Sequence, residues 1–270
     1  MGGCHELRSR QQIESLSDLQ TRRLVSGVRR WWAECMRVQS DKPAKSGGWM
    51  WQLQGTSTPH PVPLPVRGGE GGSKPTTINA TKLMRDWLSS TDAGDLETFS
   101  HELGLSVASV IAVSAAYAAP RSTWAFPMCN GYGNVVGIRL RNERCKFAVR
   151  GSKQGIFLAN MPPQKTLFVC EGPTDTAAAV ELGLFAVGRP NCCCGGAEIK
   201  IYARRLGVAR VVIVSDNDKP GLDGARKVGS ELKLPFAIYV PPAKDLREFV
   251  RLGGTRAMIE NTLNNTVWIT

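Results

Sequence analysis

The last third of the chain alternates short apolar runs with segments of helical periodicity. The runs are rich in β-branched residues. Apolar runs of this length are typical of strands that are buried on both faces of a parallel sheet, with a crossover helix after each strand. The pattern therefore predicts an α/β fold in which helices flank a parallel sheet. The expected strands are 165–170, 184–187, 210–215 and 236–240, and the expected helices are 174–182, 197–206 and 221–232.

The region before these strands has a different pattern. Helical spacing comes first, and Ser106 is a good N-cap for the third helix. From Trp124 onward, alternating apolar and polar positions and the turn at Asn130-Gly-Tyr-Gly predict antiparallel strands. We therefore expect a small α+β subdomain over 76–164. Its helices are predicted over 81–90, 95–103 and 107–117, and its strands over 124–128, 135–141, 145–150 and 155–158.

The first 75 residues lack the pattern of a packed core. Apolar positions from Ile13 to Trp32 have roughly helical spacing, which predicts a helix within residues 1–40. The following segment is rich in Pro and Gly, as linkers are, although it contains Trp49 and Trp51. We expect this region to be poorly ordered and assign no chemistry to it. Residues 253–270 are expected to form a carboxy-terminal extension.

Acidic residues follow two of the predicted strands at the point where each strand ends. Glu171 follows the first strand, and Asp216 and Asp218 follow the third. Because the carboxyl ends of parallel strands meet at one edge of a sheet, these three side chains are expected to converge. Three like charges are tolerable there if a cation lies between them, and carboxylate oxygens suit Mg²⁺ that is shared with a phosphate. Arg189, after the second strand, is expected at the same edge.

Basic residues gather on the predicted antiparallel strands. Six lie between positions 139 and 153, with Glu143 as the only acid among them. Alternation places Arg139 and Arg141 on one face of their strand, and Lys146 and Arg150 on one face of the next. Such a face suits the phosphates of a nucleotide or a template strand, although an ordinary solvated face would have the same pattern.

Composition and cysteine usage narrow the class of protein. The chain has 34 Lys and Arg against 23 Asp and Glu, a formal charge of +11, which fits a polyanionic partner but also serves solubility alone. Its eight cysteines show neither a disulfide framework nor the CxxC spacing of a zinc ribbon, so no zinc is expected. With no apolar targeting segment and no membrane-spanning run, we expect a cytoplasmic protein without a membrane partner.

Three motifs together resemble a known family. Glu171-Gly-x-x-Asp175 followed by Asp216-x-Asp218 and then Gly221 resembles the TOPRIM domain of primases, topoisomerases and related nucleases. Lys244-Asp245 resembles the third motif of bacterial and phage primases. The preceding Phe126-Pro-Met, Val136–Arg141 and Lys146 resemble the basic subdomain of those primases. The resemblance covers about residues 80–250 and implies a Rossmann-like TOPRIM domain over 165–252.

The resemblance also implies roles for particular residues. Glu171, Asp216 and Asp218 would be catalytic and, with Asp245, would hold Mg²⁺ or Mn²⁺. Gly172, Asp175 and Gly221 would support the site, with a structural role for Asp175 as plausible as a catalytic one. The residues expected to bind nucleotide or nucleic acid are Arg139, Arg141, Lys146, Arg150, Lys153 and Lys244. No zinc module or phosphate loop matches the family pattern, so any helicase would be a separate partner.

Three functions remain open on this basis. The first is a primase-like nucleotidyltransferase that makes short primers on single-stranded DNA from nucleoside triphosphates, as in plasmids, phages and integrated elements. The second is a TOPRIM-type metal-dependent nuclease, and the third is a non-catalytic nucleic-acid-binding accessory protein. The basic strands and the Lys244-Asp245 motif favour the first over the second. A topoisomerase is disfavoured because it needs a nucleophilic Tyr on an additional large domain.

Overall fold

The computed structural model describes residues 31–35, 49–53, 78–142 and 146–270. The chain divides into two compact units, residues 1–71 and 72–270. In the first unit, β1 (Trp31–Cys35) and β2 (Trp49–Leu53) pair antiparallel, with Trp31 opposite Leu53. Two predictions are therefore wrong for these segments: the helix that was expected to reach Trp32, and the linker that was expected across Trp49 and Trp51. Both segments contain aromatic residues, which favour strands. The rest of that prediction lies outside the described residues.

The second unit begins with three helices, and the residue before each helix caps it with its side chain. They are α2 (Ala80–Ser90), α3 (Ala93–Leu103) and α4 (Val107–Ala112), capped by Asn79, Asp92 and Ser106. The prediction that the third helix continues to Tyr117 is wrong. Ser114 has a positive φ of 54°, which redirects the chain, and Ala116–Ala118 forms strand β3 instead.

An antiparallel sheet follows in the order β3-β4-β5-β6. Its other strands are β4 (Thr123–Cys129), β5 (Val135–Arg141) and β6 (Lys146–Ala148), with a short 3-10 turn η1 (Ala119–Arg121) before β4. Arg141 lies opposite Lys146 in the register, and Ile138 and Leu140 are buried on the other face. The basic face predicted for Arg139, Arg141 and Lys146 is therefore present. Because β6 ends at Ala148, Arg150 lies in the turn beyond the strand.

A five-stranded sheet forms the rest of the unit, in the order β11-β10-β8-β9-β7. Four of its strands run parallel: β8 (Thr166–Glu171), β9 (Ala186–Arg189), β10 (Arg210–Val214) and β11 (Phe236–Tyr239). The edge strand β7 (Phe157–Leu158) pairs antiparallel with β9, so the last strand of the predicted basic subdomain belongs to this sheet instead.

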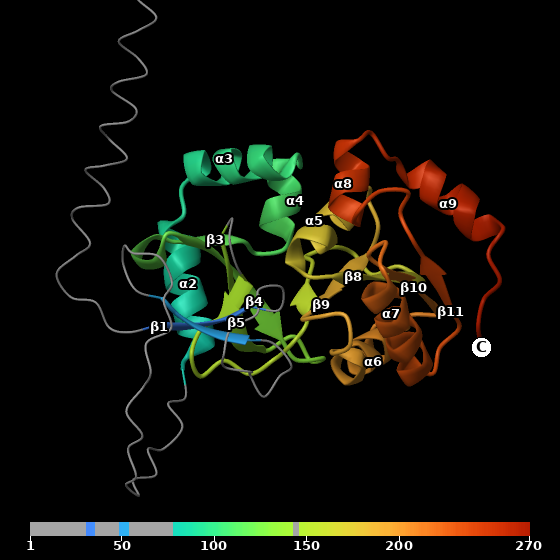
Figure 1. Ribbon diagram of the computed structural model, residues 1–270, viewed down its shortest axis with the longest axis horizontal. Helices are drawn as coiled ribbons and strands as arrows, with labels where there is room; N and C mark the ends of the chain where they lie inside the picture. Colours follow the sequence, from blue (N-terminus) through green and yellow to red (C-terminus); the bar gives the residue numbers. More distant parts are fainter. Residues whose placement is uncertain (1–30, 36–48, 54–77, 143–145) are drawn as a thin grey trace, which may run out of the picture. The chain divides into compact units, whose positions relative to one another are not determined.

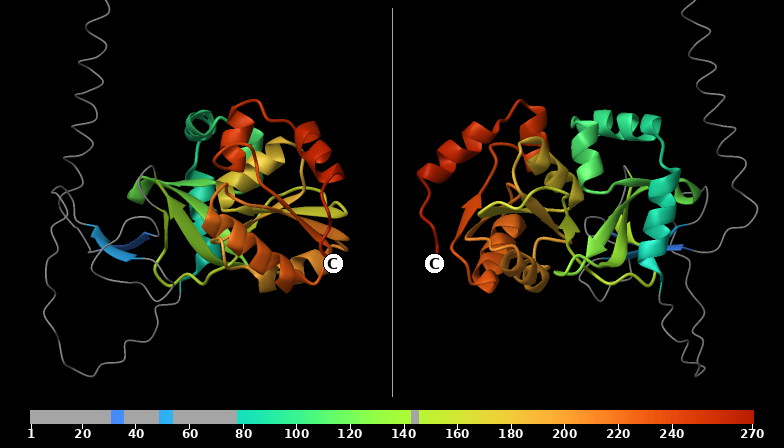
Figure 2. Two further views of the ribbon diagram at one scale, coloured as in Figure 1. Left: turned by 45° about the vertical axis from the view of Figure 1, so that its right-hand side comes forward. Right: turned by 180° about the vertical axis from the view of Figure 1, so that it is seen from behind.

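Helices cover both faces of the parallel sheet (Figures 1 and 2). On one face, α5 (Pro173–Glu181), α8 (Leu246–Arg251) and α9 (Arg256–Asn264) pack on Phe168, Val212 and Val214. On the other face, α6 (Gly196–Arg205) and α7 (Lys219–Leu232) pack on Val169 and Ile213. Alternate residues of each strand thus enter opposite cores. The predicted α/β fold with a flanked parallel sheet is confirmed.

None of the helices in the described part of the chain has the length and apolar character of a membrane span.

Candidate active site

The acidic residues predicted to converge come from the carboxyl ends of three neighbouring parallel strands. Glu171 is the last residue of β8, Asp216 and Asp218 follow β10, and Asp245 follows β11. The backbone N–H of Asn217 donates to the carbonyl of Lys244 at 3.2 Å, so the loops after β10 and β11 are joined directly. The strand order β11-β10-β8 therefore places these loops side by side.

Two glycines allow the chain to make the tight turns at these strand ends. Gly172 has a positive φ of 89°, which turns the chain from β8 into α5. At Gly221, a Cβ would lie 2.8 Å from the carbonyl oxygen of Asp216, so a larger residue would push α7 away from the loop. Both glycines that were predicted to support the site are thus required by the local backbone.

Two of the predicted metal ligands also cap helices. Asp218 Oδ1 accepts from the N–H of Gly221 at 2.7 Å, at the start of α7. Asp245 Oδ1 accepts from the N–H of Glu248 at 2.7 Å, at the start of α8. Each cap uses one carboxylate oxygen to satisfy a helix donor and so fixes the direction of the side chain. The second oxygen of each carboxylate is left for other interactions.

Glu171, Asp216, Asp218 and Asp245 together are called the acidic cluster, and Asp175, near it, joins two helices. It is buried in the first turn of α5, and its Oδ1 accepts from the N–H of Arg247 in α8 at 3.1 Å. Burial, followed by repulsion from Asp245, raises the pKa of Asp175 to about 6, while the positive charge of Lys146 acts against this rise. The contact with Arg247 gives Asp175 a structural role in the unit.

Asp216 is the residue on which the charges of the cluster act together. Burial first, and then repulsion from Glu171, Asp175, Asp245 and Asp218, raises the pKa of Asp216 from 3.8 to about 7. Four carboxyl groups from three other segments of the chain and from its own loop thus disfavour the charged form of this side chain. A cation among them would remove that repulsion.

The donor set fits a divalent cation that is shared with phosphate. Glu171 Oε2 is buried without a hydrogen-bond partner, so the protein alone does not satisfy this carboxylate, whose side chain is 27% exposed. Among the described residues, no group of three or more Asp, Glu, His or Cys side chains is arranged to hold a metal ion by itself. Mg²⁺ commonly takes one or two carboxylates and completes its shell with water and substrate phosphates. The residues fit that open arrangement, and joint ligation by Glu171, Asp216 and Asp218 stays a prediction.

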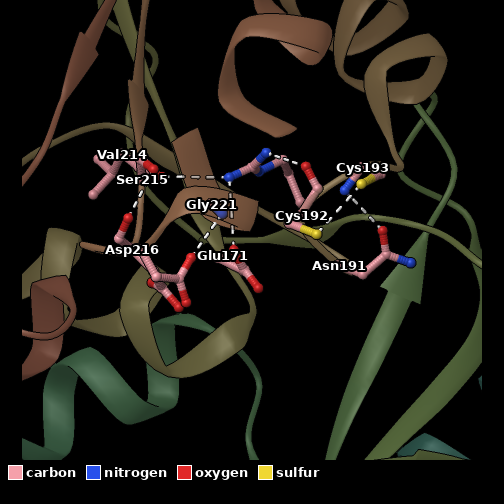
Figure 3. Close-up of polar contacts among 10 residues, drawn as sticks. Glu171, Asn191, Cys192, Cys193, Val214, Ser215, Asp216 and Gly221 are labelled. Carbon is pink, nitrogen blue, oxygen red and sulfur yellow. Dashed lines mark hydrogen bonds and ion pairs between the residues drawn. The ribbon is translucent and has the colours of Figure 1, made fainter. Parts of the chain in front are cut away.

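Arg189 lies at this edge of the sheet, as expected, but its side chain is fully buried. It ends β9 and lies opposite Glu171 in the register between β8 and β9. Its Nη2 lies 3.9 Å from Glu171 Oε2, and its Nη1 donates to the carbonyl of Cys192 at 2.6 Å (Figure 3). The sequence indicated the position of Arg189, because it is a charged residue at the end of an apolar run. The pattern did not indicate that its side chain is buried.

The basic face of the antiparallel sheet contacts the same loops. Arg141 Nη1 donates to Thr174 Oγ1 at 2.5 Å, beside the start of α5, and Arg139 Nη2 donates to the carbonyl of Pro190 at 3.3 Å, after β9. Lys146 is close enough to act on the pKa of Asp175. These three residues therefore border the acidic cluster. The other predicted phosphate-binding residues, Arg150, Lys153 and Lys244, are exposed in loops.

A cavity of about 740 Å³ opens beside these contacts. It lies among α3, the antiparallel sheet and α8, and its lining includes Phe99, Tyr117, Trp124, Arg141 and Arg247. The rings of Phe99 and Trp124 stack with their centroids 4.0 Å apart, and the Tyr117 ring is tilted against Trp124 at 5.5 Å. The cavity adjoins the start of α5, where the guanidinium of Arg141 donates to Thr174 and the backbone N–H of Arg247 donates to Asp175. We call this cavity the aromatic groove.

Comparisons with known proteins place the fold. No family model matches the sequence, and no curated protein matches it significantly. Among solved structures, a DnaG primase catalytic domain bound to single-stranded DNA matches with a TM-score of 0.53 and 14% identity, over 69% of this chain and 78% of that one. The fold is that of a primase catalytic core. The primase fragment of the bacteriophage T7 primase-helicase matches with a TM-score of 0.50 and 19% identity, over 71% and 81% of the two chains.

A third primase structure agrees with these two. The RNA polymerase domain of Mycobacterium tuberculosis primase DnaG, in complex with double-stranded DNA, matches with a TM-score of 0.51 and 16% identity, over 69% of this chain and 79% of that one. Identities this low establish the primase fold and not the chemistry. The resemblance to primase catalytic cores that the motifs predicted is confirmed at this level.

Proposed function

We propose that the protein is a primase-like nucleotidyltransferase that makes short primers on single-stranded DNA by metal-dependent phosphoryl transfer. One observation supports this most strongly: four carboxyl groups act on Asp216 at the edge of the parallel sheet that also meets the basic face of the antiparallel sheet. An acidic cluster that needs a cation thus lies beside groups that attract phosphate. A triphosphate with its metal ion needs both.

The proposed reaction joins two nucleotides. A ribose 3′-hydroxyl attacks the α-phosphate of an incoming nucleoside triphosphate, and pyrophosphate leaves. Glu171, Asp216, Asp218 and Asp245 would hold Mg²⁺ or Mn²⁺, which neutralises phosphate charge and lowers the pKa of the attacking hydroxyl when bound. Arg141 and Lys146 would bind the phosphates from the other side, while exposed Lys244 would extend this positive surface beside Asp245.

The aromatic groove supports the choice of single-stranded DNA as the template. Aromatic rings stack with bases of any sequence, and arginines hold the backbone, which is the usual combination in proteins that bind single strands. Tyr117 and Trp124 supply the rings, and Arg141 and Arg247 supply the charge. The groove adjoins the start of α5, where Arg141 contacts Thr174 and the backbone of Arg247 contacts Asp175. The proposed partners are therefore a single-stranded template and nucleoside triphosphates. A helicase is a further proposed partner, suggested by the sequence alone.

A primer-synthesis assay tests the proposal. The full chain is incubated with single-stranded DNA, nucleoside triphosphates and Mg²⁺ or Mn²⁺, and the products are separated on a denaturing gel. Labelled oligomers that need the metal are expected, and they should disappear with Asp216→Asn. Asp223→Asn is a matched control, because Asp223 is an exposed acid of α7 that pairs only with Arg226 in the described contacts.

Two other results would reject primer synthesis. A shortened template without new oligomers would identify a nuclease that uses the same cluster. A template that is shifted on a native gel but remains intact, with no product at any metal concentration, would identify an accessory protein that binds nucleic acid. In either case the fold would be shared with primases and the activity would not.

A further inference from the structure

A single buried guanidinium contacts the carboxyl ends of three neighbouring strands. Arg189 belongs to β9, and its Nη1 donates to the carbonyl of Cys192 in the loop that follows. Its Nη2 donates to the carbonyl of Val214, the last residue of β10, at 3.5 Å and lies 3.9 Å from Glu171 Oε2 at the end of β8 (Figure 3). The Arg189 side chain is 0% exposed, so it reaches no substrate itself.

The contacts of Arg189 are not those of an optimised ion pair. A guanidinium remains charged in proteins, and burying it is costly unless carboxylates or carbonyls satisfy it. Yet the distance of 3.9 Å to Glu171 exceeds a hydrogen bond, and both Arg189 Nε and Glu171 Oε2 are buried without a partner. The positive charge therefore lies next to the carboxylate without occupying its oxygen.

We propose that Arg189 is a positioning residue of the metal site. It fixes the end of β8, which carries Glu171, relative to the end of β10, which leads to Asp216, and it places a permanent positive charge behind the carboxyl groups. The Glu171 carboxylate, on a side chain that is 27% exposed, is thereby held in place and left available to a cation. This inference rests on the proposed function, since it assigns Arg189 a role toward the same site.

A purely structural role makes a different prediction. If Arg189 only stabilised the fold, its replacement would lower the melting temperature and leave metal affinity unchanged. If Arg189 positions the metal ligands, its replacement lowers both the melting temperature and the metal affinity, because ligands that are no longer held in place bind metal less well. Partners that orient metal ligands typically contribute about 10–100-fold to metal affinity or activity.

The experiment uses the full chain with Arg189→Lys and Arg189→Met. Lys keeps the charge but lacks the planar fork, so it reaches one strand end at a time. We expect Arg189→Lys to weaken Mn²⁺ binding, measured from free Mn²⁺ by electron paramagnetic resonance, and to lower kcat, each by about tenfold or more, while KM changes little. Arg189→Met should lower the melting temperature without metal, and a fixed concentration of Mn²⁺ should raise it by less than in the wild type, because weaker binding stabilises the fold less.

A matched control is Arg205→Gln. Arg205 also donates to a backbone carbonyl, that of Gly131 at 2.9 Å, but belongs to α6 and makes no described contact with the acidic cluster. It should leave Mn²⁺ affinity and kcat unchanged. If Arg189→Lys binds Mn²⁺ as the wild type does, the inference is wrong.

A second comparison applies if the Arg189 variants do not fold. The double variant Arg189→Met/Glu171→Gln removes the guanidinium and the neighbouring carboxylate together, so neither charge is left buried without the other. If Arg189 also positions the end of β10, this double variant should bind Mn²⁺ more weakly than Glu171→Gln alone. Equal Mn²⁺ affinity in these two variants would contradict the role of Arg189. A wild type that binds Mn²⁺ in an Arg189-dependent way but makes no primers would reject the proposed function alone. Primer synthesis that Arg189→Lys leaves intact would reject the inference alone.

Discussion

Replacing Asp216 with Asn should stabilise the metal-free protein. Burial and four neighbouring carboxyl groups raise the pKa of Asp216 from 3.8 to about 7 in the folded state. A carboxyl group with a raised pKa in the fold is destabilising when it is charged. The cost is absent where both states are protonated, develops as the pH rises from about 4, and is complete above about 7. Asn has nearly the same shape and no charge, so it removes this cost.

The magnitude follows from the rise in pKa. A rise of roughly three pH units corresponds to about 4 kcal/mol, at 1.36 kcal/mol for each unit. Asp216 is only partly buried, and screening by solvent reduces this to about 2 kcal/mol. For a unit of this size, that difference corresponds to a rise of about 4–8 °C in Tm. At pH 4 the two proteins should unfold at nearly the same temperature.

Scanning calorimetry in EDTA at pH 8 and pH 4 measures the difference. Asp223→Asn, at an exposed position, should stay within about 0.5 kcal/mol of the wild type at both pH values. Saturating Mg²⁺ should stabilise the wild type more than Asp216→Asn, because the cation removes the same repulsion. Equal stability of the two proteins at pH 8, or a less stable Asp216→Asn, would refute the claim that the carboxyl groups repel one another at this edge.

Three further changes test other parts of the site. Charge reversal of Arg141 and Lys146 to Glu should weaken single-stranded DNA binding and flatten its dependence on salt in a filter-binding titration. Lys227→Glu in α7 is the control, and an unchanged slope would make the basic face a solvated surface only. Gly221→Ala places a Cβ 2.8 Å from the Asp216 carbonyl, so urea unfolding should show a loss of about 1–3 kcal/mol; wild-type stability would contradict this close packing. Tyr117→Ala should weaken binding of single-stranded DNA by about 1–3 kcal/mol in fluorescence anisotropy, and undiminished affinity would exclude the aromatic groove as the template path.

The apolar runs predicted the parallel sheet well because burial on both faces leaves a strong sequence signal. Thr166–Glu171 and Arg210–Val214 are strands close to the expected bounds, and Glu171 ends the first while Asp216 closely follows the second. Weaker local signals misled the prediction. Ala116–Ala118 continues a helical pattern, and only its pairing with β4 makes it a strand. Phe157–Leu158 looked like another strand of the basic sheet, but its partner is β9.

The burial of Arg189 shows why part of the site cannot be predicted from the sequence. Its position at a strand end was visible, but its environment depends on carbonyl groups of Cys192 and Val214 that approach only in the folded protein. The aromatic groove likewise depends on contacts that form only in the folded protein. Phe99 and Trp124 are far apart in the sequence and stack because α3 packs beside β4. Motifs thus locate the candidate site residues, while tertiary contacts determine what surrounds them.

The most direct test of the account is to locate Mn²⁺ in crystals of the full chain grown with Mn²⁺ and a nucleoside triphosphate. An anomalous-scattering peak is predicted among Glu171, Asp216 and Asp218, with oxygens of the triphosphate completing its ligands. Crystals with nucleotide bound and no such peak, or with Mn²⁺ only at other residues, would contradict the central claim that this acidic edge is a metal site for phosphoryl transfer.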